Sequence, residues 1–199
     1  MKKKEIILRE LLDLTIINKS KTTQLELAKR LGVSTSTVNN AIKDVVRLGA
    51  VDVKRTGLLV IDSKKVLLYL ASIRNLQKDI IYQTYVPVSV IEIEKNMPAG
   101  VIYTMFSAYK FQFNEVPADY SEVYVYADEK VLEEIKRRFP KKNGPPNLFV
   151  LRSDPALLQL SKASVAPPVQ IYIDLWNARQ WYAKEFLTAL ERKLKDLGI

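Results

Sequence analysis

Short polar and basic side chains recur at helical spacing between residues 35 and 47. On a helix they share one face, opposite an apolar stripe that includes Val38, Ile42 and Val45. Hydroxyl, amide and ammonium groups can bond to base edges in the major groove of DNA, where Asn suits adenine and Lys suits guanine or a phosphate. The residues that we expect to contact bases are Ser36, Asn39, Asn40 and Lys43, with Thr35 placed between bases and phosphates.

A second group of residues has the chemistry of phosphate contacts, which position a protein on DNA without reading its sequence. Hydroxyl and amide groups occur at residues 22–24, where a helix is expected to begin. Basic side chains occur at residues 54–55 and near the N-terminus. The expected phosphate contacts are Thr22, Thr23, Gln24, Lys54, Arg55 and a basic N-terminal tail from Lys2 to Lys4.

The positive charge of the chain is concentrated in the same region. The 199 residues carry a formal net charge of +9. Lys and Arg outnumber Asp and Glu by 16 to 8 through residue 80, but only by 15 to 14 from residue 81 onward. A basic excess in under half of the chain indicates that one module meets a polyanion and the other does not. Chance clustering on solvated faces is the alternative that charge alone leaves open.

The residues before the base-contacting candidates predict two helices. An amphipathic helix is predicted over residues 4–17, and a loop follows over residues 19–21. Thr22 or Thr23 can cap a second helix. This helix is expected to stop at Gly32, because glycine readily adopts the left-handed conformation at a helix C-terminus.

A third helix is predicted to begin only two residues later. Ser34 can cap it, and Val33 can fill the space beneath the turn between the two helices. Ala28 provides the small side chain that a close helix crossing needs. The run from Gln24 to Asn40 is therefore typical of a helix-turn-helix, whose second helix enters the major groove of DNA.

Two short apolar runs follow the third helix. Residues 51–55 and 58–61 have the composition of strands, and the turn between them contains a glycine, so we expect a hairpin. Lys54 and Arg55 fall at its tip, where a winged helix contacts phosphates or the minor groove. Residues 1–62 are thus predicted to form a winged helix-turn-helix domain. Three helices and a hairpin can also serve as a protein-interaction module, with Ser and Thr acting only as helix caps.

The rest of the chain predicts a linker helix and a second domain, so the expected fold class is α+β. Apolar residues three and four apart over 63–76 indicate a helix, whose stripe could pair two chains or pack within its own domain. Residues 77–199 mix strand and helix patterns and could serve dimerisation, sensing or toxin antagonism. The strands predicted there are 121–127 and 147–151. In the first, small apolar side chains on one face alternate with tyrosines on the other. The helices predicted there are 99–110, 128–139, a short one from residue 154 and 180–197, while 89–97 fits a helix or a strand equally.

The chain contains no Cys and no His. Disulfides, thiolate catalysis and Cys-ligated zinc are thereby excluded, and the commonest general base and metal ligand is absent. The remaining acidic candidates are mostly explained as helix caps or surface charges, and the six glycines form no phosphate-binding loop. We therefore expect no enzymatic activity, no cofactor and no metal. The acidic candidates weighed are Asp119, Glu122, Asp128, Glu129 and Asp174.

The longest apolar runs fall well short of the roughly 20 residues that a membrane-spanning helix needs. The basic start of the chain leads into Glu5 and Glu10 rather than into the apolar core of a signal peptide. We therefore expect a cytoplasmic protein without a membrane partner.

Five aromatic residues lie close together in the sequence between residues 103 and 113. They could form a ligand pocket or an interface, but packing in a core is the more ordinary explanation. These residues are Tyr103, Phe106, Tyr109, Phe111 and Phe113.

Two segments carry a resemblance to a known family. Residues 167–190 read PPVQIYIDLWNARQWYAKEFLTAL, and residues 97–108 read MPAGVIYTMFSA. The first is similar to the closing motif of the AbiEi-type regulators, the antitoxin components of type IV toxin-antitoxin systems, and the second resembles a Pro-x-x-x-hydrophobic-Tyr-Thr-x-x-Ser-Ala segment of that family. The matching residues of the closing motif are Pro168, Val169, Gln170, Tyr172, Asp174 and Leu175. With the winged helix in the expected order, the resemblance spans most of the chain.

The resemblance implies a DNA-binding repressor that autoregulates its own operon and opposes a nucleotidyltransferase-like toxin encoded beside it. The last helix of that family usually follows a Gly-Arg-Gly-like turn. This chain instead has Asn-Ala-Arg-Gln-Trp at residues 177–181. The resemblance therefore implies antitoxin activity less directly than it implies DNA binding.

Our interpretation of the sequence is a sequence-specific, DNA-binding transcriptional regulator. We expect an autoregulating repressor that binds double-stranded DNA as a homodimer, because one small recognition helix rarely supplies enough contacts for specificity. An effector-responsive regulator without a toxin is one alternative. The other is a winged-helix adaptor whose basic module binds an acidic protein or RNA.

Overall fold

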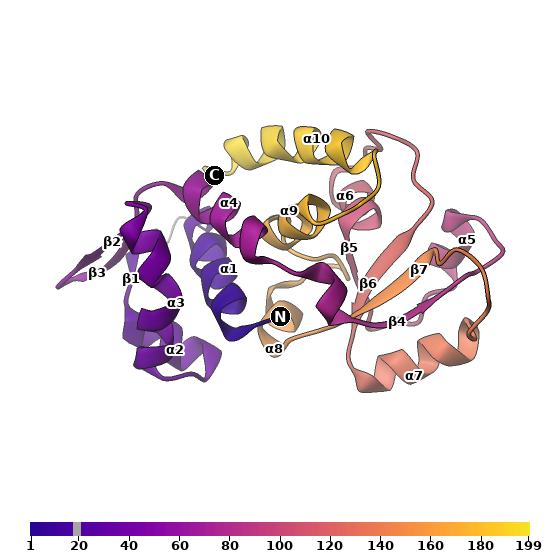
Figure 1. The fold of residues 1–199 in the computed structure, drawn as a ribbon, viewed down its shortest axis with the longest axis horizontal. Helices are drawn as coiled ribbons and strands as arrows, with labels where there is room; N and C mark the ends of the chain where they lie inside the picture. Colours follow the sequence, from indigo (N-terminus) through magenta and orange to yellow (C-terminus); the bar gives the residue numbers. More distant parts are fainter. Residues whose placement is uncertain (18–20) are drawn as a thin grey trace. The chain divides into compact units, whose positions relative to one another are not determined.

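Helices and two separate sheets make up the protein, which confirms the predicted α+β class. The computed structural model describes residues 1–17 and 21–199, and Figure 1 shows the elements along the chain. One compact unit comprises Met1–Arg74 together with Glu191–Ile199, and the other comprises Asn75–Leu190. Of the loop predicted over residues 19–21, only Lys21 lies within the described residues, and it belongs to a strand.

Helix caps set both ends of the second helix and the start of the third where the sequence predicted them. Thr23 accepts a hydrogen bond from the Glu26 backbone amide, and the Glu26 side chain bonds in return to the Thr23 backbone amide. Gly32 ends the second helix with a φ of +62°, and Ser34 caps the third by accepting from the amide of Thr37. These helices are α1 (Lys3–Ile16), α2 (Gln24–Leu31) and α3 (Thr35–Arg47).

A small antiparallel sheet follows α3, and its hairpin confirms the predicted wing. Its strands, in the order β1-β3-β2, are β1 (Lys21–Thr22), β2 (Val51–Lys54) and β3 (Gly57–Val60). The hairpin register pairs Val51 with Val60 and Lys54 with Gly57. Gly57 has a φ of +138°, and a Cβ there would lie 2.6 Å from the carbonyl oxygen of Thr22. Only glycine therefore fits where the wing passes β1.

The helix expected as a linker is shorter than predicted and contributes to the core of the first unit. It is α4 (Ser63–Ile73), which Asp62 caps by accepting from the Lys65 amide. The apolar stripe of α4, which includes Val66 and Leu70, is buried, and the helix packs on α1. A short 3-10 helix, η1 (Leu76–Asp79), begins the second unit.

The second unit is built on a four-stranded mixed sheet. Its strands, in the order β4-β7-β6-β5, are β4 (Ile80–Thr84), β7 (Leu148–Arg152), β6 (Val123–Ala127) and β5 (Ile102–Thr104). β6 and β7 are parallel, and the other pairs are antiparallel. All five residues of β6 are buried, although alternating faces were predicted. Tyr124 stacks on Phe149 with ring centroids 4.5 Å apart, and Tyr126 bonds inside the unit, so neither tyrosine faces solvent.

The helix predicted over 99–110 is wrong in its first half. The segment 102–104 is instead the edge strand β5, which pairs with β6. Its β-branched and aromatic side chains favour a strand, and Met105 then reverses the chain with a φ of +55°. The segment 89–97, which the pattern left open, contains a helix capped by Ser89. The two helices in this region are α5 (Val90–Lys95) and α6 (Met105–Phe113).

The later helices lie near their predicted positions. Asp128 and Asp154 cap α7 and α8 by accepting from the amides of Val131 and Leu157. The last helix begins three residues later than predicted. These helices are α7 (Glu129–Arg138), α8 (Pro155–Leu160), α9 (Pro168–Trp176), whose helical state the sequence did not predict, and α10 (Ala183–Asp196). In the part of the chain that the structure describes, no helix has the length and apolar character to cross a membrane.

Most of the aromatic cluster is part of the core of the second unit. Tyr103, Phe106 and Tyr109 are buried, and the Phe106 ring lies 5.0 Å from the rings of Tyr182 and Phe186. The two later members are more accessible, and Phe111 is 44% exposed. Packing is therefore the structural role of the first three residues.

Candidate nucleic-acid interface

The outer face of α3 presents the side chains that were expected to contact bases. The stripe of Val38, Ile42 and Val45 is fully buried. Because a helix turns about 100° per residue, positions 36, 40 and 43 lie on the side opposite this stripe. All five candidates of this helix are exposed: Thr35, Ser36, Asn39, Asn40 and Lys43. Ser36, Asn40 and Lys43 therefore share the outer face, with Asn39 at its edge, whereas Thr35 is exposed in the first turn on the same side as Ile42.

Arg47 extends this face by one further turn and was not among the expected contacts. It is the last residue of α3, and its side chain is 69% exposed. Its guanidinium lies 3.9 Å from the Asp44 carboxylate, which is a weak contact at an exposed position. Helical spacing from Asn40 and Lys43 was the sequence signal that could have identified it.

Two of the expected phosphate contacts serve as supports for α2. Thr22 is buried, and its hydroxyl donates to Glu26 Oε2 at 3.1 Å. Thr23 uses its hydroxyl to accept from the Glu26 amide at 3.0 Å. The Thr23 backbone amide donates to Glu26 Oε2 at 2.8 Å, and this bond, with those of the Thr23 and Thr22 hydroxyls, holds the pKa of Glu26 below its ordinary value. Gln24, at the first turn of α2, is half-buried like Thr23.

The tip of the wing carries exposed cations. Lys54 ends β2, and Arg55 lies in the turn that leads to Gly57. The Lys54 ammonium lies 3.3 Å from the carboxylate of Asp52 in an exposed pair. Such a pair is worth at most about 1 kcal/mol, so a phosphate can take the place of Asp52. Both side chains are therefore available to DNA at the tip.

The basic N-terminal tail that was expected to contact phosphates is partly helical. α1 begins at Lys3, and the Lys4 ammonium bonds to Asp44 on α3 and to the Tyr69 hydroxyl on α4. Lys2 and Lys3 are exposed at the start of the helix. The structure therefore directs Lys4 toward the body of its own unit, because two acceptors on neighbouring helices lie within its reach.

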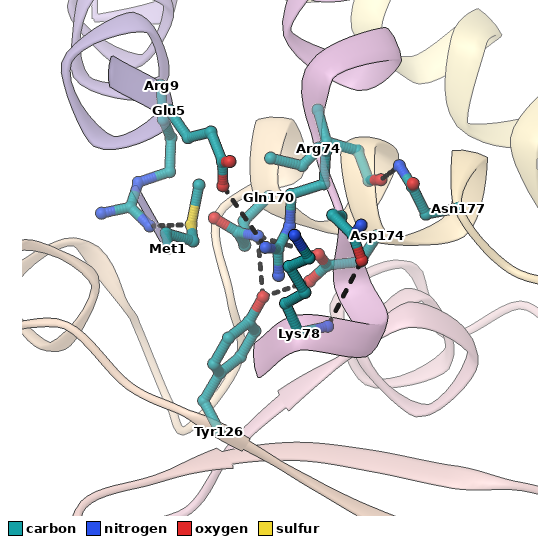
Figure 2. A network of polar contacts seen from close by, with 11 residues as sticks. Met1, Glu5, Arg9, Arg74, Lys78, Tyr126, Gln170, Asp174 and Asn177 are labelled. Atoms are coloured by element: carbon teal, nitrogen blue, oxygen red, sulfur yellow. Dashed lines mark hydrogen bonds and ion pairs between the residues drawn. The ribbon is translucent and has the colours of Figure 1, made fainter. Parts of the chain in front are cut away.

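Buried charged residues on α1 hold the first unit together beneath these surfaces. Glu10 forms an ion pair with Arg30 of α2, and Glu5 forms one with Arg74 at 3.4 Å (Figure 2). Asp13 is 4% exposed, and burial raises its pKa to about 7 against the lowering effect of Arg9. The scaffold of the DNA-facing helices therefore includes a carboxyl group that titrates near neutral pH.

The second unit has its own buried polar cluster, formed by residues of the closing motif. The Asp174 carboxylate on α9 accepts hydrogen bonds from Thr104 at 2.8 Å and from Tyr126 at 2.6 Å. The amide of Gln170 donates to the same carboxylate at 3.0 Å and to the Tyr126 hydroxyl at 2.8 Å (Figure 2). Gln170 and Asp174 therefore tie α9 to β5 and β6, a role that is structural within this unit.

Three of the acidic residues considered for catalysis have hydrogen-bond partners within the second unit. Glu122 is bonded to the Tyr182 hydroxyl, and burial raises its pKa. Asp128 caps α7, and Asp174 is held in the cluster on α9. Across residues 1–17 and 21–199, no group of three or more acidic side chains is placed to hold a metal ion.

A comparison with family models agrees with this geometry. Residues 4–52 match a model described as winged helix-turn-helix DNA-binding. The match begins in α1, contains α2 and α3, and ends in β2. Comparisons with curated proteins and with solved structures found no match. The N-terminal unit thus contains a winged helix-turn-helix DNA-binding domain, and this supports a DNA-binding regulator.

Proposed function

We propose that this protein is a sequence-specific transcriptional regulator that binds double-stranded DNA as a homodimer and represses its own promoter. The observation that carries the proposal is the exposed polar and basic face of α3, from Ser36 to Arg47, in a domain that matches a winged helix-turn-helix model. A recognition helix of this kind reads bases in the major groove. A homodimer doubles the contacts through a two-fold symmetric site.

Two contact types separate sequence reading from general attraction to DNA. Replacing Asn40 by Ala removes an amide suited to adenine, so it should cost about 1 to 3 kcal/mol on the specific site and nothing on random DNA. Replacing Lys54 by Ala removes one phosphate contact, so it should weaken binding to all DNA and reduce the salt slope by about one. Affinity measurements on both DNAs over a salt series test this assignment. Equal losses for Asn40→Ala on specific and random DNA would contradict it.

The finer proposal is that the protein opposes a nucleotidyltransferase-like toxin encoded beside it. Its support is the resemblance of segments 97–108 and 167–190 to AbiEi-type regulators. Co-expression with the neighbouring gene tests this role directly. Growth arrest by that gene alone and rescue by this protein would support the antitoxin, whereas a harmless neighbour would favour an effector-responsive regulator. We also propose that the chain catalyses no reaction and acts in the cytoplasm.

An adaptor that binds an acidic protein or RNA is the competing class. Both classes respond to salt, because both use the same basic surface. Affinity that depends on the DNA sequence separates them, since an adaptor has no reason to prefer one duplex over another.

A further inference from the structure

Three polar side chains from three helices meet beside the DNA-facing side of α3. The Tyr69 hydroxyl on α4 donates to Asp44 Oδ2 at 2.7 Å. The Lys4 ammonium on α1 bonds to the same carboxylate oxygen and donates to the Tyr69 hydroxyl at 2.6 Å. The ammonium also lies 5.0 Å from the centre of the Tyr69 ring. We name this trio of Lys4, Asp44 and Tyr69 the Asp44 clamp.

The clamp lies at the border of the DNA-facing surface. Asp44 follows Asn40 by four residues, about one helical turn, and its side chain is 40% exposed. A free carboxylate at this border would repel DNA phosphates. Hydrogen bonds from Lys4 and Tyr69 keep the pKa of Asp44 below its ordinary value. The Asp44 carboxylate therefore stays ionised, and the Lys4 ammonium offsets its negative charge.

The clamp also closes a loop of chain around the wing. The end of α3, both strands of the hairpin and the start of α4 lie between Asp44 and Tyr69 in sequence. A bond between the two residues that bound this segment fixes the recognition helix relative to the helix that leaves the wing. Lys4 adds α1 to the same point, so all three helices share one polar junction.

We propose that Lys4 and Tyr69 are positioning residues for DNA recognition, which orient α3 through Asp44 so that its base-contacting face and the wing tip engage DNA together. This inference rests on the proposed function. Hydrogen bonds to bases require the side chains to be placed within about 0.5 Å of the productive position. Phosphate contacts by long flexible side chains tolerate larger shifts. Loosening the clamp therefore weakens specific binding more than general binding.

The test uses the full chain and two DNA probes. One probe is the duplex that the wild-type protein recovers by selection from random double-stranded DNA, and the other is a random duplex. Tyr69→Phe removes the hydroxyl with both of its hydrogen bonds and keeps the ring, so we expect about a 5- to 10-fold weaker affinity for the selected duplex. The affinity for the random duplex should change by less than about two-fold. Asp44→Asn, which keeps the shape and an acceptor for Tyr69, provides a second variant with the same expected direction.

Lys4→Gln in the Asp44→Asn background, where no carboxylate is left to repel phosphates, distinguishes the clamp from a direct phosphate contact. A positioning role through Asp44 predicts no further loss on either duplex and an unchanged salt slope. A phosphate contact predicts a loss on both duplexes and a salt slope reduced by about one, and this result would overturn the proposal. Thermal unfolding of each variant by circular dichroism verifies that the measured protein is folded.

A matched control comes from the second unit. Tyr82 is half-buried, and its hydroxyl donates to the carbonyl oxygen of Phe139 at 2.7 Å, so Tyr82→Phe removes a tyrosine hydroxyl from the unit that does not contain α3. It should leave both affinities unchanged. If the ratio of the affinities for the selected and random duplexes is the same in Tyr69→Phe and Tyr82→Phe, the proposal is overturned. A lower stability of Tyr69→Phe alone would then mean that the clamp is only a structural contact. A wild-type protein without sequence preference would instead overturn the proposed function itself and the clamp with it.

Discussion

The buried carboxyl group of Asp13 predicts that the first unit becomes less stable as the pH rises toward neutrality. Burial raises the pKa of Asp13 from 3.8 to about 7, so the folded chain holds a proton that the unfolded chain releases above about pH 4. The stability that this protonation provides is complete below about pH 4 and is lost as the pH rises to about 7. A difference of about 3 pKa units corresponds to about 4 kcal/mol at most.

Asp13→Asn tests this reasoning because it removes the charge and keeps the shape. We expect the free energy of unfolding of the variant to exceed that of the wild type by about 1 to 4 kcal/mol at pH 8. At pH 4 the two values should be about equal. Urea unfolding at a series of pH values, followed by far-UV circular dichroism, measures the difference. Trp176 and Trp181 are the only tryptophans of the chain and both lie in the second unit, so their fluorescence follows that unit separately.

Asp52→Asn is the matched control for this experiment. Asp52 belongs to the same unit but is far more accessible, and its partner is the exposed Lys54. Its replacement should change the free energy of unfolding by no more than about 0.5 kcal/mol at any pH. An Asp13→Asn variant whose advantage in stability over the wild type does not grow between pH 4 and pH 8, or one that is less stable than the wild type at pH 8, would refute the assignment of a raised pKa to Asp13.

The other predictions concern the wing and the second unit. Gly57→Ala places a methyl group 2.6 Å from the Thr22 carbonyl oxygen at a φ of +138°, so it should destabilise the first unit by about 1 to 3 kcal/mol and weaken binding to specific and random DNA alike. Unfolding followed by circular dichroism and the two DNA affinities check this prediction. Unchanged stability and unchanged affinities would contradict it. Asp174→Ala leaves the buried donors of Thr104 and Tyr126 without this acceptor, so the tryptophan-monitored transition should shift by about 3 kcal/mol or more. Asp119→Ala, at an exposed position, should leave that transition in place.

Local chemistry explains why the first three helices and the wing were predictable from the sequence. Thr23, Gly32 and Ser34 act through hydrogen bonds and backbone conformations that involve only their near neighbours in the chain. The base-contacting candidates followed from the same helical period, which placed Asn40 and Lys43 opposite the buried stripe. Arg47 obeys this period and was identifiable in the same way.

The features that the sequence did not predict depend on contacts between distant segments. The 99–110 segment was predicted as one helix, but its residues 102–104 pair with β6, which lies about twenty residues later in the chain. Lys4 is 40 residues from Asp44 in sequence, so nothing local distinguishes it from a solvated basic tail. The protonation of Asp13 likewise depends on burial, which no short pattern in the sequence reveals.

The Asp44 clamp connects these distant contacts with the proposed function. The polar face of α3 supplies the chemistry of base reading, and the clamp ties that helix to α1 and α4. The two parts make separate predictions, because Asn40 acts on a base and Tyr69 acts on the orientation of the helix. A double variant of Asn40→Ala and Tyr69→Phe should therefore lose less specific affinity than the two single losses combined, since a misplaced helix no longer uses Asn40 fully.

A footprint on genomic DNA from the source organism, at near-physiological salt and with random competitor DNA present, separates a sequence-specific regulator from an adaptor. We predict protection of a two-fold repeat upstream of the protein's own gene, and loss of that protection in Asn40→Ala. Binding that disappears under competitor DNA would show only nonspecific attraction between the basic unit and phosphates. That result would contradict sequence-specific regulation and favour the adaptor.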